Sequence, residues 1–302
     1  MKITIDRMNL LRPLGHVSSV VERRNTIPIL ANIVLRAESS KLSLTATDMD
    51  MDIMTELDCS VIQEGSCTVP AHLLNDIIRK LPDGCEVSIH VSDGNAQISA
   101  GRSSFKVPTL PVDDFPAFNT SDLPVKFILT TADLRHQIDM TRFAISTEET
   151  RYYLNGIYFH KSDSGALAAV ATDGHRLALA RIDMPQGAET MPEIILPRKA
   201  VGELRKLLDD AEGEMHVSLS ETRAEFAFGS VRLTSKLIDG SFPDYTRVIP
   251  EGNDKILTVD RSLFSSAVDR VSTISSEKSR SVKLAVSGTT LTLSASNPDA
   301  SS

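Results

Sequence analysis

Residues 3–14 read ITIDRMNLLRPL, and the same pattern returns as FILTTADLRHQI at residues 127–138 and as ILTVDRSLFSSAV at residues 256–268. Each copy opens with β-branched residues, which favour a strand, and continues with apolar residues three or four positions apart, which favour an amphipathic helix. Self-similarity at a long period indicates a repeated structural unit. The pattern therefore predicts three copies of one unit, each beginning with a strand followed by a helix.

The similarity between the copies continues after these openings. The equivalent residues Thr47 and Thr172 are 125 positions apart, which is close to the length of a domain. A proline begins a second helix in the first two copies, a position that its fixed φ suits, and alternating segments favour antiparallel strands. The matched segments are 30–35 (LANIVL), 154–159 (LNGIYF) and 282–284 (VKL); 42–48 (LSLTATD), 167–173 (LAAVATD) and 291–297 (LTLSASN); 69–84 and 196–213; and 114–116 (DFP) and 241–243 (SFP). Each copy is predicted to be an α+β unit with two helices and antiparallel sheets.

The third copy is shorter than the others. We place domains at residues 1–125, 126–253 and 254–302, which leaves 49 residues for the third. Such a piece would lack its second helix and last strands, and half of a repeat cannot bury its own apolar faces. We therefore expect the full-length protein to continue for about 70 residues beyond Ser302 to complete the repeat.

The composition excludes several classes of protein. A net charge of −8 argues against binding a polyanion by bulk charge. The N-terminus is charged and no apolar stretch approaches the roughly 18 residues that cross a bilayer, so we expect a cytoplasmic protein without membrane association. Three cysteines, with no C-x-x-C pair and no histidine at metal-site spacing, predict neither a disulfide framework nor a metal site. We expect no cofactor.

Charge is distributed unevenly between the predicted helices and the rest of the chain. The five helical segments carry 14 basic and 7 acidic side chains, a charge of +7, which leaves −15 elsewhere. These segments are 7–24, 71–82, 131–143, 198–208 and 260–271. Positive helices on a negative body predict a helical surface that faces a polyanion, while the sheets face solvent.

The helix at residues 198–208 shows this distribution most clearly. At 100° per residue, its basic side chains gather on one side and its leucines and valine on the other. The basic set is Arg198, Lys199, Arg205 and Lys206. Gly202 lies within the basic side and leaves room for a close approach. A solvated charged face is the alternative interpretation of such a helix.

Patterns that would indicate catalysis or metal binding are weak. His175 is the best candidate for chemistry, yet it lies in TDGHR at 172–176, where Asp-Gly between alternating strands predicts a hairpin. The S-x-x-K pattern occurs twice, at 103–106 and 275–278, so it is too loose to indicate an enzyme. The aspartates of residues 48–52 lack the Gly and Glu that a calcium loop needs later in the motif. We predict no catalytic residue and no metal site.

Several longer runs resemble the family of bacterial DNA polymerase III beta subunits, the sliding clamps. The runs are 26–32 (TIPILAN), 151–156 (RYYLNG), 172–178 (TDGHRLA), 196–199 (LPRK) and 234–248 (TSKLIDGSFPDYTRV). The resemblance implies three DNA-clamp domains of α+β type, each with two helices on an inner face and antiparallel sheets outside, the third being incomplete here. It also implies a non-catalytic processivity factor that closes as a ring-shaped homodimer around double-stranded DNA, independently of DNA sequence.

The resemblance further implies which residues contact DNA and which close the ring. In the family, duplex DNA is touched at the positions of Arg24, Tyr152 and Tyr153, and the basic side of the helix at 198–208 would line the channel. Surface charge and core aromatics are the alternative interpretations of these residues. The ring would close between two chains, through Phe105 and Val107 of one and Thr273 and Ile274 of the other.

A second implied surface is a shallow pocket for short linear peptides. The peptides would come from the polymerase III alpha subunit, the clamp loader delta subunit, translesion polymerases, mismatch-repair proteins and DNA ligase. The family completes the pocket with a C-terminal Met-Pro-Met type segment, which this sequence does not reach. The positions that map onto it are Leu154, Thr172, Gly174, His175, Arg176, Leu177, Pro243, Arg247 and Val248.

Two other functions remain as alternatives from the residues alone. An enzyme in an unfamiliar α+β fold would need titratable groups that converge in one cleft. A repeated scaffold that binds only proteins would not be retained on DNA.

Overall fold

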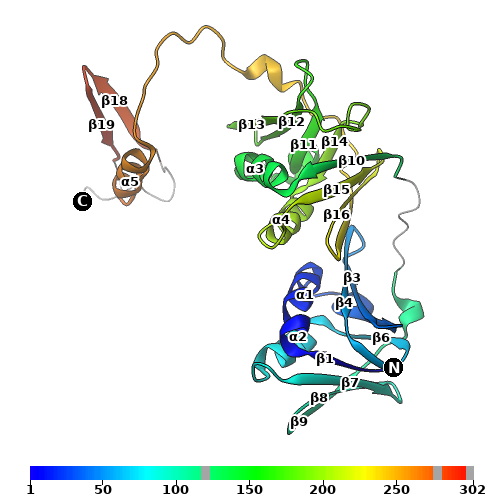
Figure 1. Ribbon diagram of the computed structural model, residues 1–302. Helices are drawn as coiled ribbons and strands as arrows, with labels where there is room; N and C mark the ends of the chain where they lie inside the picture. Colours follow the sequence, from blue (N-terminus) through cyan, green and yellow to red (C-terminus); the bar gives the residue numbers. More distant parts are fainter. Residues whose placement is uncertain (117–122, 275–280, 297–302) are drawn as a thin grey trace. The chain divides into compact units, whose positions relative to one another are not determined.

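The computed structural model describes residues 1–116, 123–274 and 281–296. The chain forms two compact units, Met1–Phe242 and Pro243–Ser302 (Figure 1). Unit 1 contains the first sequence repeat and most of the second, and unit 2 contains the end of the second repeat and the residues of the third.

The first repeat folds as two antiparallel sheets with two helices. Its elements are β1 (Lys2–Asp6), α1 (Arg7–Val20), η1 (Pro28–Ala31), β2 (Asn32–Glu38), β3 (Lys41–Thr47), β4 (Met51–Asp58), β5 (Ser60–Gln63), β6 (Gly65–Pro70), α2 (Ala71–Lys80), β7 (Glu86–Ser92), β8 (Asn95–Ala100), β9 (Ser103–Pro108) and η2 (Val112–Asp114). One sheet has the order β5-β1-β7-β8-β9, and the other four strands join a larger sheet. The predicted pair of helices among many antiparallel strands is confirmed.

The opening strand and helix are fixed by one cap and by burial. Asp6 caps α1, because its side chain accepts hydrogen bonds from the backbone N–H groups two and three residues later. Leu10 and Leu14, one turn apart, are fully buried. Arg7 is also buried and donates to the carbonyl oxygen of Ile78 at 2.9 Å, which ties α1 to the C-terminal end of α2.

The second repeat follows a similar order of elements, with four strands between its two α-helices where the first repeat has five. They are β10 (Val125–Thr130), α3 (Thr131–Thr141), η3 (Arg142–Ala144), η4 (Glu149–Leu154), β11 (Gly156–Lys161), β12 (Leu167–Thr172), β13 (Leu177–Ile182), β14 (Ile194–Pro197), α4 (Arg198–Leu207), β15 (Glu214–Leu219), β16 (Arg223–Phe228) and β17 (Val231–Lys236). Strands β13-β12-β11-β14 form a four-stranded sheet in that order. The pair β10-α3 corresponds to β1-α1, and β14-α4 corresponds to β6-α2.

One continuous sheet joins the two repeats of unit 1. Its order is β10-β15-β16-β17-β4-β3-β2-β6, so each repeat contributes four strands. Strand β17 pairs antiparallel with β4, from Val231 opposite Thr55 to Ser235 opposite Met51. The helices form a row, because α2 packs on α1, α1 on α4 and α4 on α3 (Figure 1). The predicted α+β fold, with helices gathered on one side and antiparallel sheets on the other, is confirmed.

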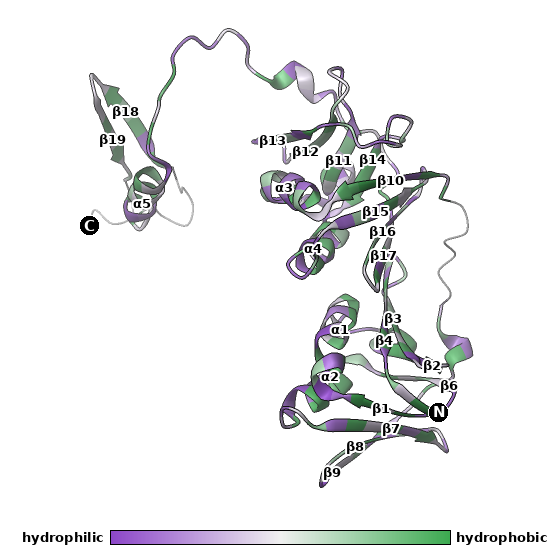
Figure 2. Cartoon of the chain, viewed as in Figure 1, coloured by the Kyte–Doolittle hydropathy of each residue, from purple (hydrophilic) through white to green (hydrophobic). Residues whose placement is uncertain are grey.

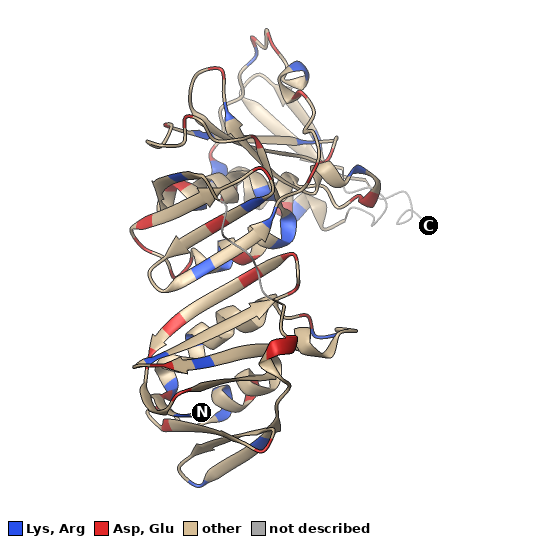
Figure 3. Cartoon of the chain, turned by 90° about the vertical axis from the view of Figure 1, so that its right-hand side faces the viewer, with Lys and Arg blue, Asp and Glu red and all other residues tan. Residues whose placement is uncertain are grey.

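Apolar residues from both repeats form one core. Figure 2 shows green and purple residues interleaved along α1 to α4, as expected of helices that each bury one face. At the junction of the repeats, Ile53 and Leu233 are directly opposite each other and fully buried. The strands that face the viewer in Figure 3 carry both acidic and basic residues. No helix in the described residues is long and apolar enough to cross a membrane.

Unit 2 contains η5 (Tyr245–Val248), α5 (Arg261–Ser272), β18 (Lys283–Ser287) and β19 (Thr290–Ser294). Asp260 caps α5 by accepting a hydrogen bond from the N–H of Leu263, and β18 and β19 form an antiparallel hairpin. No residue of α5 is buried, and Leu263 is 73% exposed. This exposure agrees with the expectation that part of a repeat cannot bury its apolar faces alone.

One strand predicted from the repeat is not formed. Residues 256–259, which match the opening strands of the other repeats, have no strand hydrogen bonding. In unit 1 the opening strands are held by neighbours, β1 by β5 and β7, and β10 by β15. The described residues of unit 2 contain no counterpart of β5, β7 or β15, so the alternating pattern has no sheet to join. The helix forms as predicted because its hydrogen bonds are internal.

Candidate nucleic-acid interface and peptide-binding hairpin

The basic side of α4 is the first candidate site. The apolar side of this helix packs against β11 and β14, which fixes the direction of the basic side. Arg198, Lys199 and Lys206 are exposed. Arg205 is half-buried. Apart from its chain neighbours and the backbone of α4 itself, no atom lies within 4 Å of the position that a Cβ would take on Gly202, so the basic side is open at its centre, as predicted.

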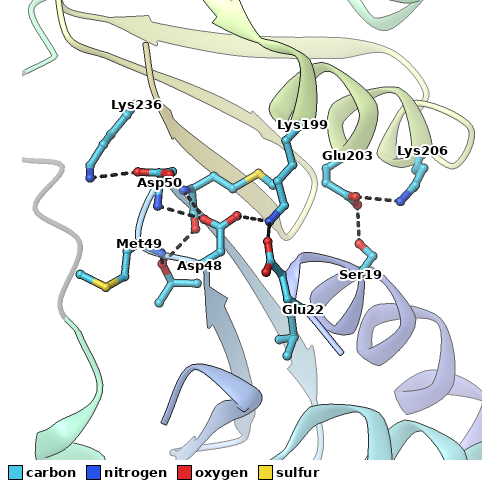
Figure 4. A network of polar contacts seen from close by, with 12 residues as sticks. Ser19, Glu22, Asp48, Met49, Asp50, Lys199, Glu203, Lys206 and Lys236 are labelled. Carbon is cyan, nitrogen blue, oxygen red and sulfur yellow. Dashed lines mark hydrogen bonds and ion pairs between the residues drawn. The ribbon is translucent and has the colours of Figure 1, made fainter. Parts of the chain in front are cut away.

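Lys199 also joins the two repeats. Its Nζ donates to Asp48 Oδ2 at 2.6 Å and to Glu22 Oε1 at 2.8 Å, and both carboxylates belong to the first repeat (Figure 4). Partial burial alone would lower the pKa of Lys199, but the hydrogen bonds to Asp48 and Glu22 outweigh it and raise that pKa above its ordinary value. Lys199 is therefore a charged link between repeats as well as a candidate DNA contact.

The remaining turn of α4 carries further ion pairs. Arg205 Nε donates to Asp139 Oδ1 at 2.7 Å, which connects α4 to α3. Lys206 Nζ donates to Glu203 Oε1 at 2.7 Å, and Glu203 Oε2 also accepts a hydrogen bond from Ser19 of α1 at 2.5 Å (Figure 4). Most of the predicted DNA-facing charge on α4 thus takes part in intramolecular contacts.

Arg198 and Arg24 differ from these residues. Both are exposed, and neither forms an ion pair within the described part of the chain. Helix α1 ends at Val20 because the backbone becomes extended at Val21. Arg24 therefore lies beyond the helix, although the sequence pattern predicts a helix through residue 24. The two arginines are the predicted DNA contacts whose charge is least compensated.

Tyr152 and Tyr153 lie side by side in η4. Their ring centroids are 5.8 Å apart and their planes meet at 76°. Tyr152 is 53% exposed, so it is a surface side chain and not a core aromatic. A Cβ on Gly240 would lie 3.1 Å from Tyr153 Cβ, which shows how closely the segment after β17 packs beneath the pair.

The turn between β12 and β13 is the centre of the predicted peptide pocket. Asp173 Oδ1 accepts hydrogen bonds from the backbone N–H groups of His175 and Arg176, each at 2.9 Å. Desolvation alone would raise the pKa of Asp173, but these hydrogen bonds lower it. Gly174 has a φ of +87°, which a glycine adopts without strain. The Asp-Gly hairpin predicted from the sequence is formed, and His175 and Arg176 are exposed on it.

Two residues that the sequence reasoning did not select brace this turn. Arg151 Nε donates to Glu148 Oε2 at 2.8 Å, and a Cβ on Gly174 would lie 2.7 Å from Arg151 Nη1. The guanidinium of Arg176 lies over the ring of Phe143, 5.8 Å from its centroid. Arg151 could have been selected because it begins the run RYYLNG, but the prediction for this run concerned only its two tyrosines.

The other pocket residues of unit 1 lie beside the turn. Leu154 is buried at the end of η4. Thr172 Oγ1 donates to the carbonyl oxygen of Arg176 at 2.8 Å and so closes the turn. Leu177 begins β13 and is half-buried, which leaves part of its side chain available for contact.

The last three predicted pocket residues belong to unit 2. Pro243 is its first residue, and Arg247 and Val248 lie in η5. Arg247 Nε pairs with Asp244 Oδ2 at 2.8 Å, and Val248 is exposed.

Comparison with known proteins identifies the family. Three family profiles match successive parts of the chain: the N-terminal domain of the DNA polymerase III beta subunit over residues 1–119, its central domain over 128–244 and its C-terminal domain over 246–302. The beta sliding clamp of Caulobacter vibrioides is 54% identical over 305 aligned residues, which cover 99% of this chain and 82% of that protein. The chain belongs to the DNA polymerase III beta subunit family, the beta sliding clamps.

More distant clamps and solved structures agree with this assignment. The beta sliding clamp of Escherichia coli K12 is 39% identical, over 99% of this chain and 81% of that protein. The crystal structure of the Bartonella birtlesii sliding clamp bound to griselimycin superposes with a TM-score of 0.96 at 50% identity, over 99% of this chain and 81% of that one. The resemblance inferred from the sequence is confirmed.

As a sliding clamp, the protein is a processivity factor of a DNA polymerase and not an enzyme. Within the described residues, His175 forms no side-chain hydrogen bond or ion pair that would orient it as a base. The S-x-x-K pattern at 275–278 lies outside the described residues.

The predicted ring-closing residues of the clamp lie on β9 and after α5. Strand β9 is an edge of the five-stranded sheet, so its backbone has groups available for pairing with another chain. Phe105 on β9 is exposed, whereas Val107 is buried in the core of its own repeat. In unit 2, Thr273 and Ile274 follow α5, and Ile274 is exposed.

Proposed function

We propose that this protein closes around duplex DNA as a ring-shaped homodimer and tethers the replicative DNA polymerase to its template in the cytoplasm. Arg24, Tyr152, Tyr153 and the basic side of α4 face the DNA in this proposal. The ring closes through β9 and Phe105 of one chain and the residues around Ile274 of another. Val107 then contributes its edge-strand backbone, since its side chain is buried.

The continuous layering of unit 1 is the observation that supports this proposal most strongly. A row of four helices is backed by a sheet that passes from one repeat into the next without a break. Such a wall can keep one helical surface toward a long ligand over more than one repeat. The basic side of α4 belongs to that layer, and Gly202 allows a phosphate backbone to approach it closely.

The ion pairs on α4 suit a clamp that slides. A closed ring retains DNA topologically, so it does not need tight contacts, and contacts to bases would create stopping points. Lys199 and Arg205 already have carboxylate partners, so a phosphate must compete with them for hydrogen bonds. Arg24 and Arg198 then provide most of the phosphate contacts, which exchange readily because both side chains are exposed.

The second part of the proposal concerns partners. The exposed turn with His175 and Arg176, together with Leu154 and Leu177 beside it, binds short linear peptides. A small apolar surface beside a few polar groups suits a peptide that orders on binding. The proposed sources are the polymerase III alpha subunit, the clamp loader delta subunit, translesion polymerases, mismatch-repair proteins and DNA ligase.

Retention on circular DNA tests the ring. The protein is placed on nicked circular DNA by a clamp loader, free protein is removed by gel filtration, and the circle is cut with a restriction enzyme. We expect the protein to stay on the circle and to leave the linear DNA. Equal loss from circular and linear DNA would contradict topological retention and favour the scaffold that binds only proteins.

A variant with a blocked interface provides the matched control. Phe105→Arg places a charge on the exposed side chain of β9 without changing the core. It should keep its melting temperature and leave circular DNA as quickly as linear DNA.

A further inference from the structure

The outer face of the first repeat has a groove beneath residues 112–116, which we call the strap. The groove has a volume of about 660 Å³ and lies on the side of β2, β3 and β4 that faces away from the helices. Its lining includes Val34, Thr45, Asp52, Met54, Phe115 and Pro116, and we call it the strap groove. None of the residues that line the groove belongs to the predicted peptide pocket or to the turn of residues 172–177.

The second repeat has stacked aromatic side chains at the equivalent positions. Phe115 of the strap corresponds to Phe242, and Val34 beneath it corresponds to Tyr158. In the second repeat, Phe242 stacks on Tyr158 with centroids 4.7 Å apart and planes 5° apart, and His160 stacks against Tyr158 at 4.6 Å. In the first repeat, the tyrosine is replaced by a valine, which is too small to reach the strap. The strap groove therefore has a valine where the other copy has an aromatic ring.

A carboxylate lies at one end of the strap groove. Asp52 is 7% exposed, and its Oδ1, which is fully buried, has no hydrogen-bond partner within the described residues. The second repeat has Leu177 at this position, so the carboxylate is specific to the first. Nearby Arg232 pairs with Glu225 at 3.6 Å. Burial, followed by repulsion from Glu225, raises the pKa of Asp52 to about 7, although attraction to Arg232 and Arg223 opposes the rise.

The space beneath Phe115 and the carboxylate of Asp52 define the kind of ligand that would fit the strap groove. Val34, Thr45 and Met54 are cross-strand neighbours in one row, so they form a floor for a flat ring below Phe115. Asp52 is two residues from Met54 on the same face of β4, about 7 Å away at the usual rise of a strand. A ring on the floor and a cationic group at Asp52 can therefore belong to neighbouring side chains of one extended peptide.

We propose that the strap groove binds a short extended peptide of a partner protein, in which an aromatic side chain is followed by a basic one. The aromatic ring stacks under Phe115 in the place that Tyr158 occupies in the second repeat. The basic side chain pairs with the part of the Asp52 carboxylate that lines the groove. The hydroxyl groups of Ser43, Thr45 and Thr47 line the same groove and can hydrogen-bond to the peptide backbone. This surface is separate from the proposed polymerase-binding pocket.

Methionine methyl NMR can test this binding directly. The full chain is labelled with ¹³C at its methionine methyl groups, and the Met54 signal is assigned with the variant Met54→Leu. The probe is the acetylated and amidated tetrapeptide Ala-Tyr-Lys-Ala. We expect the ring current of the tyrosine to shift the Met54 signal on titration. The signal of Met49, which does not line the groove, should stay in place.

Matched peptides and variants separate specific binding from weak adhesion. Ala-Tyr-Glu-Ala, and the original peptide with the variant Asp52→Asn, should each bind about tenfold more weakly, because the charged hydrogen bond is lost. The variant Val34→Tyr should abolish the shift, since it fills the groove as the second repeat does. If this variant lowers the melting temperature, Phe115→Ala replaces it, and it should also abolish the shift. An unchanged Met54 signal, or equal affinity for Asp52→Asn and the wild type, would overturn the proposal.

Discussion

The turns between β3 and β4 and between β12 and β13 occupy the same place in two repeats and have the same local geometry. In the first, Asp48 Oδ1 accepts from the backbone N–H groups of Asp50 and Met51 at 2.9 and 2.8 Å. In the second, Asp173 Oδ1 accepts from two backbone N–H groups at the equivalent positions, each at 2.9 Å. The difference lies in the other oxygen. Asp48 Oδ2 pairs with Lys199 of the next repeat, whereas the partner of Asp173 Oδ2 among the described residues is Arg176 of its own turn.

This difference shows how one repeated turn can serve two purposes. The first turn is used inside unit 1, where Asp50 also pairs with Lys236 of the second repeat at 3.2 Å (Figure 4). Within the described residues, the acidic side chain of the second turn forms no ion pair with the other repeat. The side chains of this turn therefore remain available to partners. Local sequence specifies the turn in both cases, and the residue placed opposite decides its role.

The largest expected effect comes from a charge placed beside the second turn. Leu177→Lys should weaken binding of a peptide from the tail of the polymerase alpha subunit by about 100-fold, because a half-buried apolar contact becomes a desolvated cation. The melting temperature should change by no more than about 2 °C, since Leu177 is not part of the buried core. Fluorescence anisotropy of a labelled peptide and thermal unfolding measure the two quantities.

The first turn provides the control for this substitution. Met49→Lys changes an exposed residue of the equivalent turn and should leave peptide affinity unchanged. A melting temperature lowered by more than about 8 °C in Leu177→Lys would instead assign the leucine to the core.

The next effect concerns stability and the two capping aspartates. Asp48→Ala should lower the free energy of unfolding by about 2 kcal/mol, because it removes both the cap of the turn and the carboxylate partner of Lys199. Asp173→Ala should cost about 1 kcal/mol, because only contacts within its own turn are lost. Urea denaturation measures both. A double-mutant cycle of Asp48→Ala with Lys199→Met should show non-additive losses, and additive losses would mean that the ion pair does not join the repeats.

An effect of a different kind, on the pH dependence of stability, is expected from Asp52, the residue equivalent to Leu177. Its pKa of about 7 in the folded protein is above the ordinary value of 3.8 for an aspartate. The folded state therefore holds a proton that the unfolded state releases, and stability falls as pH rises from about 4 to about 7. The slope contributed by this group is at most about 1.4 kcal/mol per pH unit.

The variant Asp52→Asn should flatten this part of the stability profile, because an amide does not titrate. Asp50→Asn, which changes an exposed carboxylate two residues away, should retain the slope. Thermal unfolding at several pH values between 4 and 8 measures both variants. If the profiles of Asp52→Asn and the wild type coincide, the proton on Asp52 does not contribute to folding.

The repeat itself could be predicted from the sequence because it depends on local patterns. Caps such as Asp6, the Asp-Gly turn at Asp173 and the apolar face of α4 are all encoded within a few residues, and the structure contains each of them. The strand predicted at residues 256–259 failed for the complementary reason, because a strand needs neighbours that its own sequence does not supply.

The ion pairs of the candidate DNA surface could not be predicted in this way. Lys199 meets Glu22 and Asp48, which are more than one hundred residues earlier in the chain. These groups meet only because β17 pairs with β4, and nothing in either strand specifies a partner from another repeat. The sequence therefore indicated which residues are basic and on which side they lie, but not which of them are already paired.

That distinction leads to the smallest expected effect, on DNA affinity. Arg198→Ala should reduce the slope of log affinity against log salt by about 1, because one exposed cation no longer displaces a counterion from a phosphate. Lys199→Ala should reduce the slope by less than half as much and should also lower the melting temperature, because its charge is shared with Glu22 and Asp48. Anisotropy of a labelled duplex between 50 and 200 mM salt measures the slopes. Equal slopes for the two variants would show that the ion pairs of Lys199 with Glu22 and Asp48 open on DNA. Lys199 would then exchange these carboxylates for phosphate when the ring is loaded.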